Sequence, residues 1–146
     1  LMKILLAVDE SKFSEEAMKT VAGQFPPQGT EVRVLHVLQP IALTAPPQMA
    51  AGYAPELEAQ EKQARELVER MAQTLRAAGF KVEAAVEKGD IREKIIDAAA
   101  AWHAGLIMIG SHGRRGVQRF LLGSVAEFVV RHAPCSVQVV RLASGR

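Results

Sequence analysis

The chain has 146 residues, of which 49% are hydrophobic and 23% are charged, and its formal net charge at pH 7 is +2. This composition is typical of globular proteins and excludes the disordered class. The length suits one domain with a sizeable core, so we expect residues 1–146 to form a single domain. The small net charge does not indicate nucleic acid, and we expect none as a partner.

The first apolar run and the cysteine content indicate the compartment. The run at residues 4–8 is closed by Asp9 and Glu10, so it is too short for a secretion signal or a membrane span. The one cysteine, Cys135, cannot form an intrachain disulfide, and its place between Pro134 and an apolar run indicates a buried structural thiol. We therefore expect a cytoplasmic protein with no membrane partner.

Short runs typical of β-strands alternate with helical segments along the chain. The strand-like runs are residues 3–8, 31–38, 81–87, 106–110 and 136–141. Most of them are almost continuous in Val, Ile and Leu, as expected when helices cover both faces of a parallel sheet. The pattern predicts a doubly wound α/β fold with five strands and four helices.

The first two helices have recognisable ends and apolar sides. The first is expected from near Ser14 to just before Pro26, and the second from about Glu56 to Ala78, with Gly79 as its stop. The apolar side of the first helix consists of Ala17, Met18, Val21, Ala22 and Phe25. The i,i+4 spacing predicts three ion pairs along the second helix, namely Glu58–Lys62, Glu61–Arg65 and Glu66–Arg70.

The last two helices open with capping signals. Asp90, with Glu93 three residues later, predicts the N-terminus of the third helix, in which Trp102 belongs to the core. Ser124 with Glu127 predicts a capping box that opens the fourth helix. The Ser124 hydroxyl can serve as this cap or bind a phosphate oxygen, and both uses stay open.

Two short segments that follow predicted strands carry the candidate chemistry. Asp9 comes after the first strand, and Gly110-Ser-His-Gly113 comes after the fourth. Ligands of open parallel sheets bind beyond the carboxyl ends of the strands. If the two strands are neighbours, the Asp9 carboxylate faces the glycine segment and can accept hydrogen bonds from a ribose or an adenine amine. Alternatively, Asp9 belongs to the turn that enters the first helix.

The glycines have the layout of a phosphate cradle. Gly110 and Gly113 are followed, after nine further residues, by Gly123 and Ser124 at the start of a helix. Glycines let backbone N–H groups approach an anion closely, and a helix N-terminus adds unpaired donors and the positive end of its dipole. The spacing is neither that of a P-loop nor that of a dinucleotide fingerprint. A nucleotide-binding α/β domain is therefore the favoured interpretation.

The remaining polar side chains give little indication of catalysis or of a metal centre. His112 lies between two glycines of the cradle and is placed to donate to a ligand. The four histidines are scattered, and no pair of them has the spacing of a zinc site. The sequence contains no nucleophile elbow, so we expect no catalytic residue.

At these residues the chain resembles the universal stress protein family, and the resemblance extends over essentially its whole length. The ATP-binding pattern of the family is Gly, two residues, Gly, nine residues, Gly and then Ser or Thr. It stands here as Gly110, Gly113, Gly123 and Ser124. Supporting matches are residues 4–11, His36-Val37, Gly89-Asp90 and residues 131–135.

The resemblance implies a sheet in the order 3-2-1-4-5 and an ATP molecule, with Mg²⁺ or Mn²⁺, in a crevice between strands 1 and 4. It implies that Asp9 and Val37 contact adenine and ribose, and that Ala7 and Val8 line the same pocket. The residues implied to hold the ribose and phosphates are Gly110, His112, Gly113, Gly123, Ser124 and Val125. Arg114 adds positive charge beside them and completes the predicted site.

The family also implies a stress-response regulatory role and a homodimer formed by antiparallel pairing of the last strands, here the run from Ser136 to Arg141. This run lacks the proline and the inward charge that usually block edge pairing.

Two positions depart from the family. Ala126 stands where ATP-binding relatives often have Ser or Thr, and the loss of that hydroxyl can weaken the affinity for phosphate. Gly105 stands where the family commonly has Asp.

Other functions are compatible with the sequence to different degrees. A phospho-accepting receiver domain is disfavoured because no lysine follows the fifth strand. A slow ATPase stays open because Arg114, Arg115 or Arg119 can clamp a phosphate, although no general base is evident. A dimeric adaptor with a vestigial nucleotide pocket also stays open, with the Pro- and Ala-rich residues 39–55 or the charged second helix as its working surface.

Overall fold

The computed structural model describes residues 1–39, 54–113 and 122–142 of the chain. Strands and helices alternate along it. They are β1 (Met2–Ala7), α1 (Lys12–Gln24), β2 (Thr30–Leu38), α3 (Ala54–Ala77), β3 (Lys81–Lys88), α4 (Ile91–Trp102), β4 (Leu106–Gly110), α5 (Ser124–His132) and β5 (Ser136–Val140). Most of the segment at residues 39–55, considered above as a working surface, lies outside the described residues.

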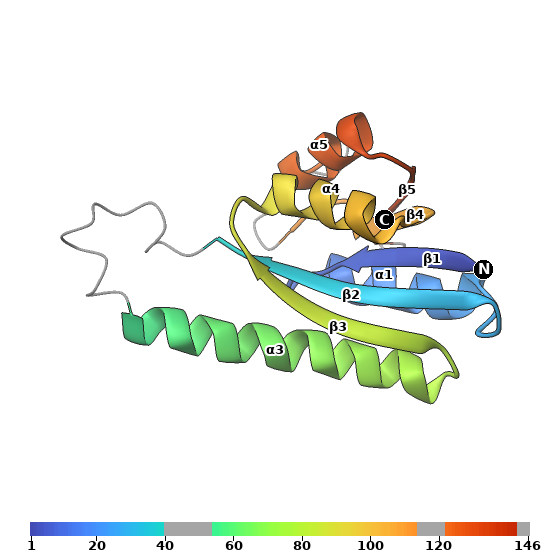
Figure 1. The fold of residues 1–146 in the computed structure, drawn as a ribbon, viewed down its shortest axis with the longest axis horizontal. Coiled ribbons are helices and arrows are strands. Elements are labelled where there is room, and N and C mark those ends of the chain that lie inside the picture. The colour runs from blue at the N-terminus through green and yellow to red at the C-terminus, as the bar shows by residue number, and fades with distance from the viewer. Residues whose placement is uncertain (40–53, 114–121, 143–146) are drawn as a thin grey trace.

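The five strands form one parallel sheet in the order β3-β2-β1-β4-β5, which confirms the predicted fold and strand order. Figure 1 shows α1 and α3 on one face of the sheet and α4 and α5 on the other. Ile4 and Leu6 of β1 belong to the core on the first face, and Leu5 and Ala7 to the core on the second. The apolar runs are continuous because helices bury both faces of the strands.

The strand order places β1 and β4 side by side. From β1 the chain moves to β2 and β3 on one side, and β4 and β5 lie on the other side. Ala7 near the end of β1 is in register with Ile109 near the end of β4. The segments after these two strands therefore meet at the switch point of the sheet, where ligands of such folds bind.

Helix α1 begins at Lys12, earlier than predicted, because Ser11 is its N-cap. The Ser11 hydroxyl accepts a hydrogen bond from the backbone N–H of Ser14 at 3.3 Å. Ala17, Met18 and Val21 are buried as predicted, and Phe25 packs against the same core, whereas Ala22 is exposed, which corrects its assignment to the apolar side.

Helix α3 ends at Ala77, and Gly79 follows with φ at +99°. The three ion pairs predicted along this helix do not form within the described part of the chain. Glu61 instead pairs with Lys88 at 2.6 Å, and Glu69 pairs with Arg76 at 2.7 Å. The first of these pairs ties α3 to the end of β3, a neighbour that spacing along one helix cannot reveal.

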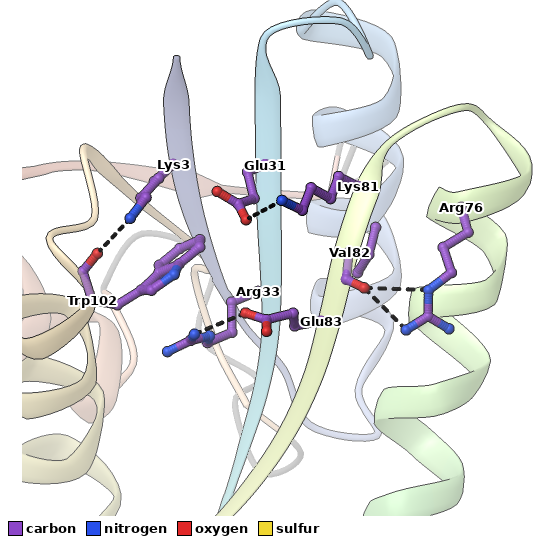
Figure 2. A network of polar contacts seen from close by, with 8 residues as sticks. All are labelled: Lys3, Glu31, Arg33, Arg76, Lys81, Val82, Glu83 and Trp102. Carbon is purple, nitrogen blue, oxygen red and sulfur yellow. Dashed lines mark hydrogen bonds and ion pairs between the residues drawn. The ribbon is translucent and has the colours of Figure 1, made fainter.

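Helix α4 begins as predicted, because Oδ1 of Asp90 accepts from the backbone N–H of Glu93 at 3.1 Å. Trp102 at its other end is buried, as predicted. Figure 2 shows Trp102 beside Lys3 and Arg33, with the Lys3 Nζ at 5.4 Å and the Arg33 Cζ at 4.6 Å from the ring centroid. Both contacts are short enough for a cation–π interaction.

Charged side chains cover the amino end of β2 and β3 (Figure 2). Arg33 pairs with Glu83 at 2.8 Å, and Glu31 pairs with Lys81 at 3.5 Å on the register-matched strand. The hydrogen bond and positive charge of Arg33 lower the pKa of Glu83 below its usual range. This end of the sheet is thus polar, and the opposite end carries the predicted site.

Two expectations about environment can be compared with the structure. No helix in the described ranges is long and apolar enough to cross a membrane. Cys135 is half-buried, less than the buried thiol that the sequence indicates, and this partial burial raises the pKa of the thiol.

Candidate functional site

A cavity of about 570 Å³ opens at the carboxyl end of the strands, a volume typical of small-molecule sites. Its walls come from the ends of β1, β2 and β4 and from α3, α4 and α5. Every predicted site residue that the structure describes lines it, namely Ala7, Val8, Asp9, Val37, Gly110, His112, Gly113, Gly123, Ser124 and Val125. Arg114 lies outside the described residues.

Asp9 serves the turn into α1 and also lines the cavity beside the glycine segment. Its Oδ1 accepts hydrogen bonds from the backbone N–H of Ser11 at 2.8 Å and from the hydroxyl of Ser14 at 3.0 Å. The Ser14 hydroxyl in turn accepts from the backbone N–H of Asp9 at 2.8 Å. These contacts fix the carboxylate while leaving Oδ2 directed toward Gly113.

The glycines of the cradle are required by close approaches. A Cβ on Gly110 would lie 2.5 Å from Cβ of Phe13, so this glycine lets β4 end against α1. A Cβ on Gly113 would lie 2.8 Å from Oδ2 of Asp9. A Cβ on Gly123 would lie 3.1 Å from the backbone of His112. Gly113 is thus the glycine whose missing side chain keeps the Asp9 oxygen accessible.

The N-terminus of α5 lacks the side-chain cap that the sequence predicts. The N-cap is Gly123, and Ser124 is the first helical residue, so the predicted capping box of Ser124 and Glu127 is wrong. By contrast, Ser11 caps α1, and Asp90 caps α4. Glycine has no side-chain oxygen to accept from the first amides of the helix, which leaves them available to an anion.

The residues of this first turn face the cavity. Ser124, Val125 and Ala126 all line it. The Ser124 side chain is exposed, consistent with a hydroxyl that makes no cap. Ala126 is 2% exposed, so the position that departs from the family pattern is both packed in the fold and adjacent to the cavity.

His112 is held by two neighbours. Its Nδ1 lies 3.1 Å from the Ser111 hydroxyl, and its ring packs against Phe13 with centroids 5.3 Å apart. Its Nε2 is buried without a hydrogen-bond partner. Buried polar atoms in folded proteins are nearly always paired, so this atom calls for a functional explanation.

The cavity also has walls that sequence reasoning missed. His36 lines it, and its Nδ1 lies 2.7 Å from the carbonyl oxygen of Val8, which ties the end of β2 to the end of β1. Ile91 and Ile95 of α4 and Gln63 of α3 contribute further lining. The i,i+4 spacing of the two isoleucines is the sequence signal that could have indicated this wall of the cavity.

The arrangement offers few ligands for a metal ion. In the described ranges, no group of three or more His, Cys, Asp or Glu residues is placed to hold one. The carboxylates that line the cavity within these ranges are Asp9 and Glu10. A divalent cation would fit here chiefly through the phosphates of a bound nucleotide, as is usual for Mg²⁺.

Fold and cavity together place the chain among the doubly wound α/β proteins that offer a ligand site at the switch point of the sheet. The model of the universal stress protein family matches residues 1–141. The chain belongs to this family, as the sequence resemblance predicted.

Individual relatives support the assignment. A universal stress protein of Synechocystis sp. is 28% identical over 149 residues, covering 95% of this chain and 97% of that protein. The structure of a universal stress protein from Lactobacillus plantarum is 24% identical, covers 96% of this chain and 97% of that chain, and has a TM-score of 0.86. The structure of the universal stress protein from Archaeoglobus fulgidus in complex with dAMP is 25% identical, covers 96% and 98%, and has a TM-score of 0.66.

Proposed function

We propose that this protein binds an adenine nucleotide in the cavity between β1 and β4 and acts as a stress-response regulator. The observation that carries the proposal is the uncapped N-terminus of α5, which lies at the same cavity as the fixed carboxylate of Asp9. A nucleotide carries an anionic phosphate and a ribose with hydroxyl groups. The N-terminus of α5 suits the phosphate, and the Asp9 carboxylate suits a ribose hydroxyl.

Each part of the nucleotide has a counterpart in the cavity. The phosphates bind the first amides of α5 together with Ser124, Gly123 and His112, and Arg114 adds positive charge. A ribose hydroxyl donates to Oδ2 of Asp9.

The base occupies the apolar part of the cavity. Ala7, Val8, Val37, Ile91 and Ile95 line this part, and all except Ile91 are at most 6% exposed. Mostly apolar walls with a few placed polar groups are typical of nucleotide and cofactor pockets.

The dAMP complex of the Archaeoglobus fulgidus relative supports an adenine nucleotide as the ligand class. This ligand class does not specify how many phosphates the nucleotide carries. The family pattern of Gly110, Gly113, Gly123 and Ser124 favours ATP with Mg²⁺ or Mn²⁺. The missing hydroxyl at Ala126 lowers the number of side-chain donors near the phosphates, so AMP and ATP are both to be measured.

Titration calorimetry tests the proposal. Wild-type protein is titrated with AMP, dAMP and ATP, each with and without Mg²⁺, and at least one of them is expected to bind with micromolar affinity or better. The double variant Gly113→Val and Gly123→Val is expected to lose this binding. Mass spectrometry of small molecules released from the purified protein identifies the nucleotide carried in the cell. No heat with any of the three nucleotides would favour the adaptor interpretation.

We also propose that two copies of the chain pair through β5. The two edges of the sheet differ. At the β3 edge, Arg76 donates to the carbonyl oxygen of Val82 through Nε at 3.3 Å and Nη2 at 3.0 Å, which blocks a second strand there (Figure 2). At the β5 edge, the Val140 carbonyl accepts from Ser111 on the β4 side, so the backbone of Val139 faces outward.

An antiparallel β5 pair about a twofold axis would satisfy these outward groups and give a closed dimer. Light scattering at micromolar concentration is expected to give the mass of a dimer. Val139→Pro removes an outward N–H at an edge position that tolerates proline, and it is expected to give a folded monomer. A monomeric mass for the wild type would contradict the proposed dimer but would not bear on the proposed nucleotide site.

A further inference from the structure

Ser111 is a buried polar residue beside the proposed phosphate site. It is 1% exposed. Its backbone is fixed from two directions, because its N–H donates to the carbonyl of Val140 at 2.8 Å and its carbonyl accepts from the N–H of Gly123 at 2.7 Å. Ser111 therefore occupies a rigid position between β5 and the start of α5.

The hydroxyl of Ser111 is placed to favour one tautomer of His112. Oγ lies 3.1 Å from Nδ1 of His112, and this is its one hydrogen bond among the described residues. A buried hydroxyl needs an acceptor for its hydrogen, and Nδ1 is the atom in reach. With Nδ1 accepting, a neutral imidazole keeps its proton on Nε2.

The other end of the ring then presents a donor without an acceptor. Nε2 is buried and unpaired, while Phe13 packs against the ring and restricts its rotation. Leaving a buried donor unpaired is unfavourable, and because His112 lines the cavity, a small movement of its ring on ligand binding would give Nε2 an acceptor there.

We propose that Ser111 is a positioning residue that holds His112 as a neutral Nε2–H donor to the phosphate of the bound nucleotide. The inference rests on the proposed function, because it takes the phosphate as the missing acceptor.

The tautomer is measured first, on wild-type protein without ligand. Two-bond ¹H–¹⁵N NMR spectra at neutral pH are expected to show an unprotonated Nδ1 and a protonated Nε2 for His112. Addition of AMP is expected to shift the Nε2 signal, and Ser111→Ala is expected to give a mixture of tautomers. An Nδ1–H tautomer in the wild type would overturn the proposal without the use of any variant.

The binding experiment uses AMP as the probe and adenosine as the control ligand without phosphate. Ser111→Ala is expected to weaken AMP about tenfold, the size of one lost hydrogen bond to a charged group, and to leave adenosine unchanged. Ser111→Thr restores the hydroxyl and is expected to recover AMP binding. Thermal denaturation of each variant verifies that it is folded.

A double-mutant cycle separates positioning from a merely structural role. His112→Gln places an amide donor near the position of Nε2 and needs no partner at Nδ1. In that background Ser111→Ala is expected to cost no further AMP affinity. An equal loss in both backgrounds would overturn the proposal, whereas failure of wild-type protein to bind any of AMP, dAMP and ATP would instead refute the proposed function.

Discussion

Oδ2 of Asp9 lies so close to Gly113 that a single methyl group on this glycine would approach it to 2.8 Å. The two residues belong to segments more than a hundred positions apart, which the adjacent strands β1 and β4 bring to one edge of the sheet. Since Ser11 and Ser14 fix the other oxygen of the carboxylate, Oδ2 cannot move aside without breaking the turn into α1. This geometry makes Gly113 a sensitive position for ligand binding.

Gly113→Ala is expected to weaken AMP binding at least tenfold, because the new methyl group covers the oxygen that accepts from the ribose. Because the Asp9 carboxylate is held by Ser11 and Ser14, the change is also expected to lower the free energy of unfolding, by about 1–3 kcal/mol, without unfolding the protein. Calorimetry with AMP gives the affinity, and urea denaturation gives the free energy of unfolding. Unchanged affinity would show that Asp9 does not meet the ligand at Oδ2.

Gly110→Ala is expected to act on stability instead. Its Cβ would meet Cβ of Phe13 at 2.5 Å and the Phe13 backbone at 3.0 Å, so α1 must shift. Overpacking of this kind costs about 1–3 kcal/mol of unfolding free energy. Gly23→Ala is the matched control, because nothing lies within 4 Å of its Cβ, and it is expected to leave stability unchanged or raise it by up to ~1 kcal/mol. Equal stability of the two variants would contradict the close contact at Gly110.

Asp9→Asn tests the two uses of this side chain separately. The amide oxygen of asparagine can still accept from Ser11 and Ser14, so the free energy of unfolding is expected to change by less than about 1 kcal/mol. Its amide nitrogen replaces Oδ2 and cannot accept from a ribose hydroxyl, so AMP affinity is expected to fall about tenfold. A variant that loses stability while keeping its affinity would assign Asp9 to the turn alone.

Glu83→Gln tests the polar end of the sheet. Arg33 lowers the pKa of Glu83 in the folded protein, so the ionised carboxylate contributes stability at neutral pH. Because the glutamate is 57% exposed, this contribution is less than about 1 kcal/mol. With a depressed folded pKa, the contribution is present above the ordinary value of 4.5 and is lost as pH falls below it.

Denaturation of wild type and Glu83→Gln across pH measures this difference. The wild type is expected to be slightly more stable at pH 7, and the two curves are expected to converge in the acid range. A difference that grows as pH falls would have the wrong sign for this ion pair.

The sequence was sufficient for the parts of the fold that depend on apolar pattern. Continuous runs such as residues 106–110 predicted strands buried on both faces, and the structure has β4 there with every residue buried. The glycine spacing led to the segments that line the cavity. Both features follow from local chemistry, namely burial of apolar residues and the absence of side chains at close approaches.

Features that depend on contacts between distant parts of the chain could not be predicted from the local sequence. Glu61 has Arg65 at a favourable helical spacing, yet it pairs with Lys88 of β3. Serine is a residue type that commonly caps helices, yet the N-cap of α5 is Gly123, and Ser124 is the first residue within the helix. The choice between Ser14 and Ser11 as the start of α1 depends on the Asp9 carboxylate, which binds both residues.

The central claim is that an adenine nucleotide occupies the cavity between β1 and β4, and a ¹⁵N NMR titration with AMP tests it most directly. Saturable shifts are expected at the amides of Gly110, Gly113, Ser124 and Val125, with little change at Trp102 near the amino end of the sheet. No shifts with either AMP or ATP at millimolar concentration, or saturable shifts confined to residues outside the cavity, would contradict the claim.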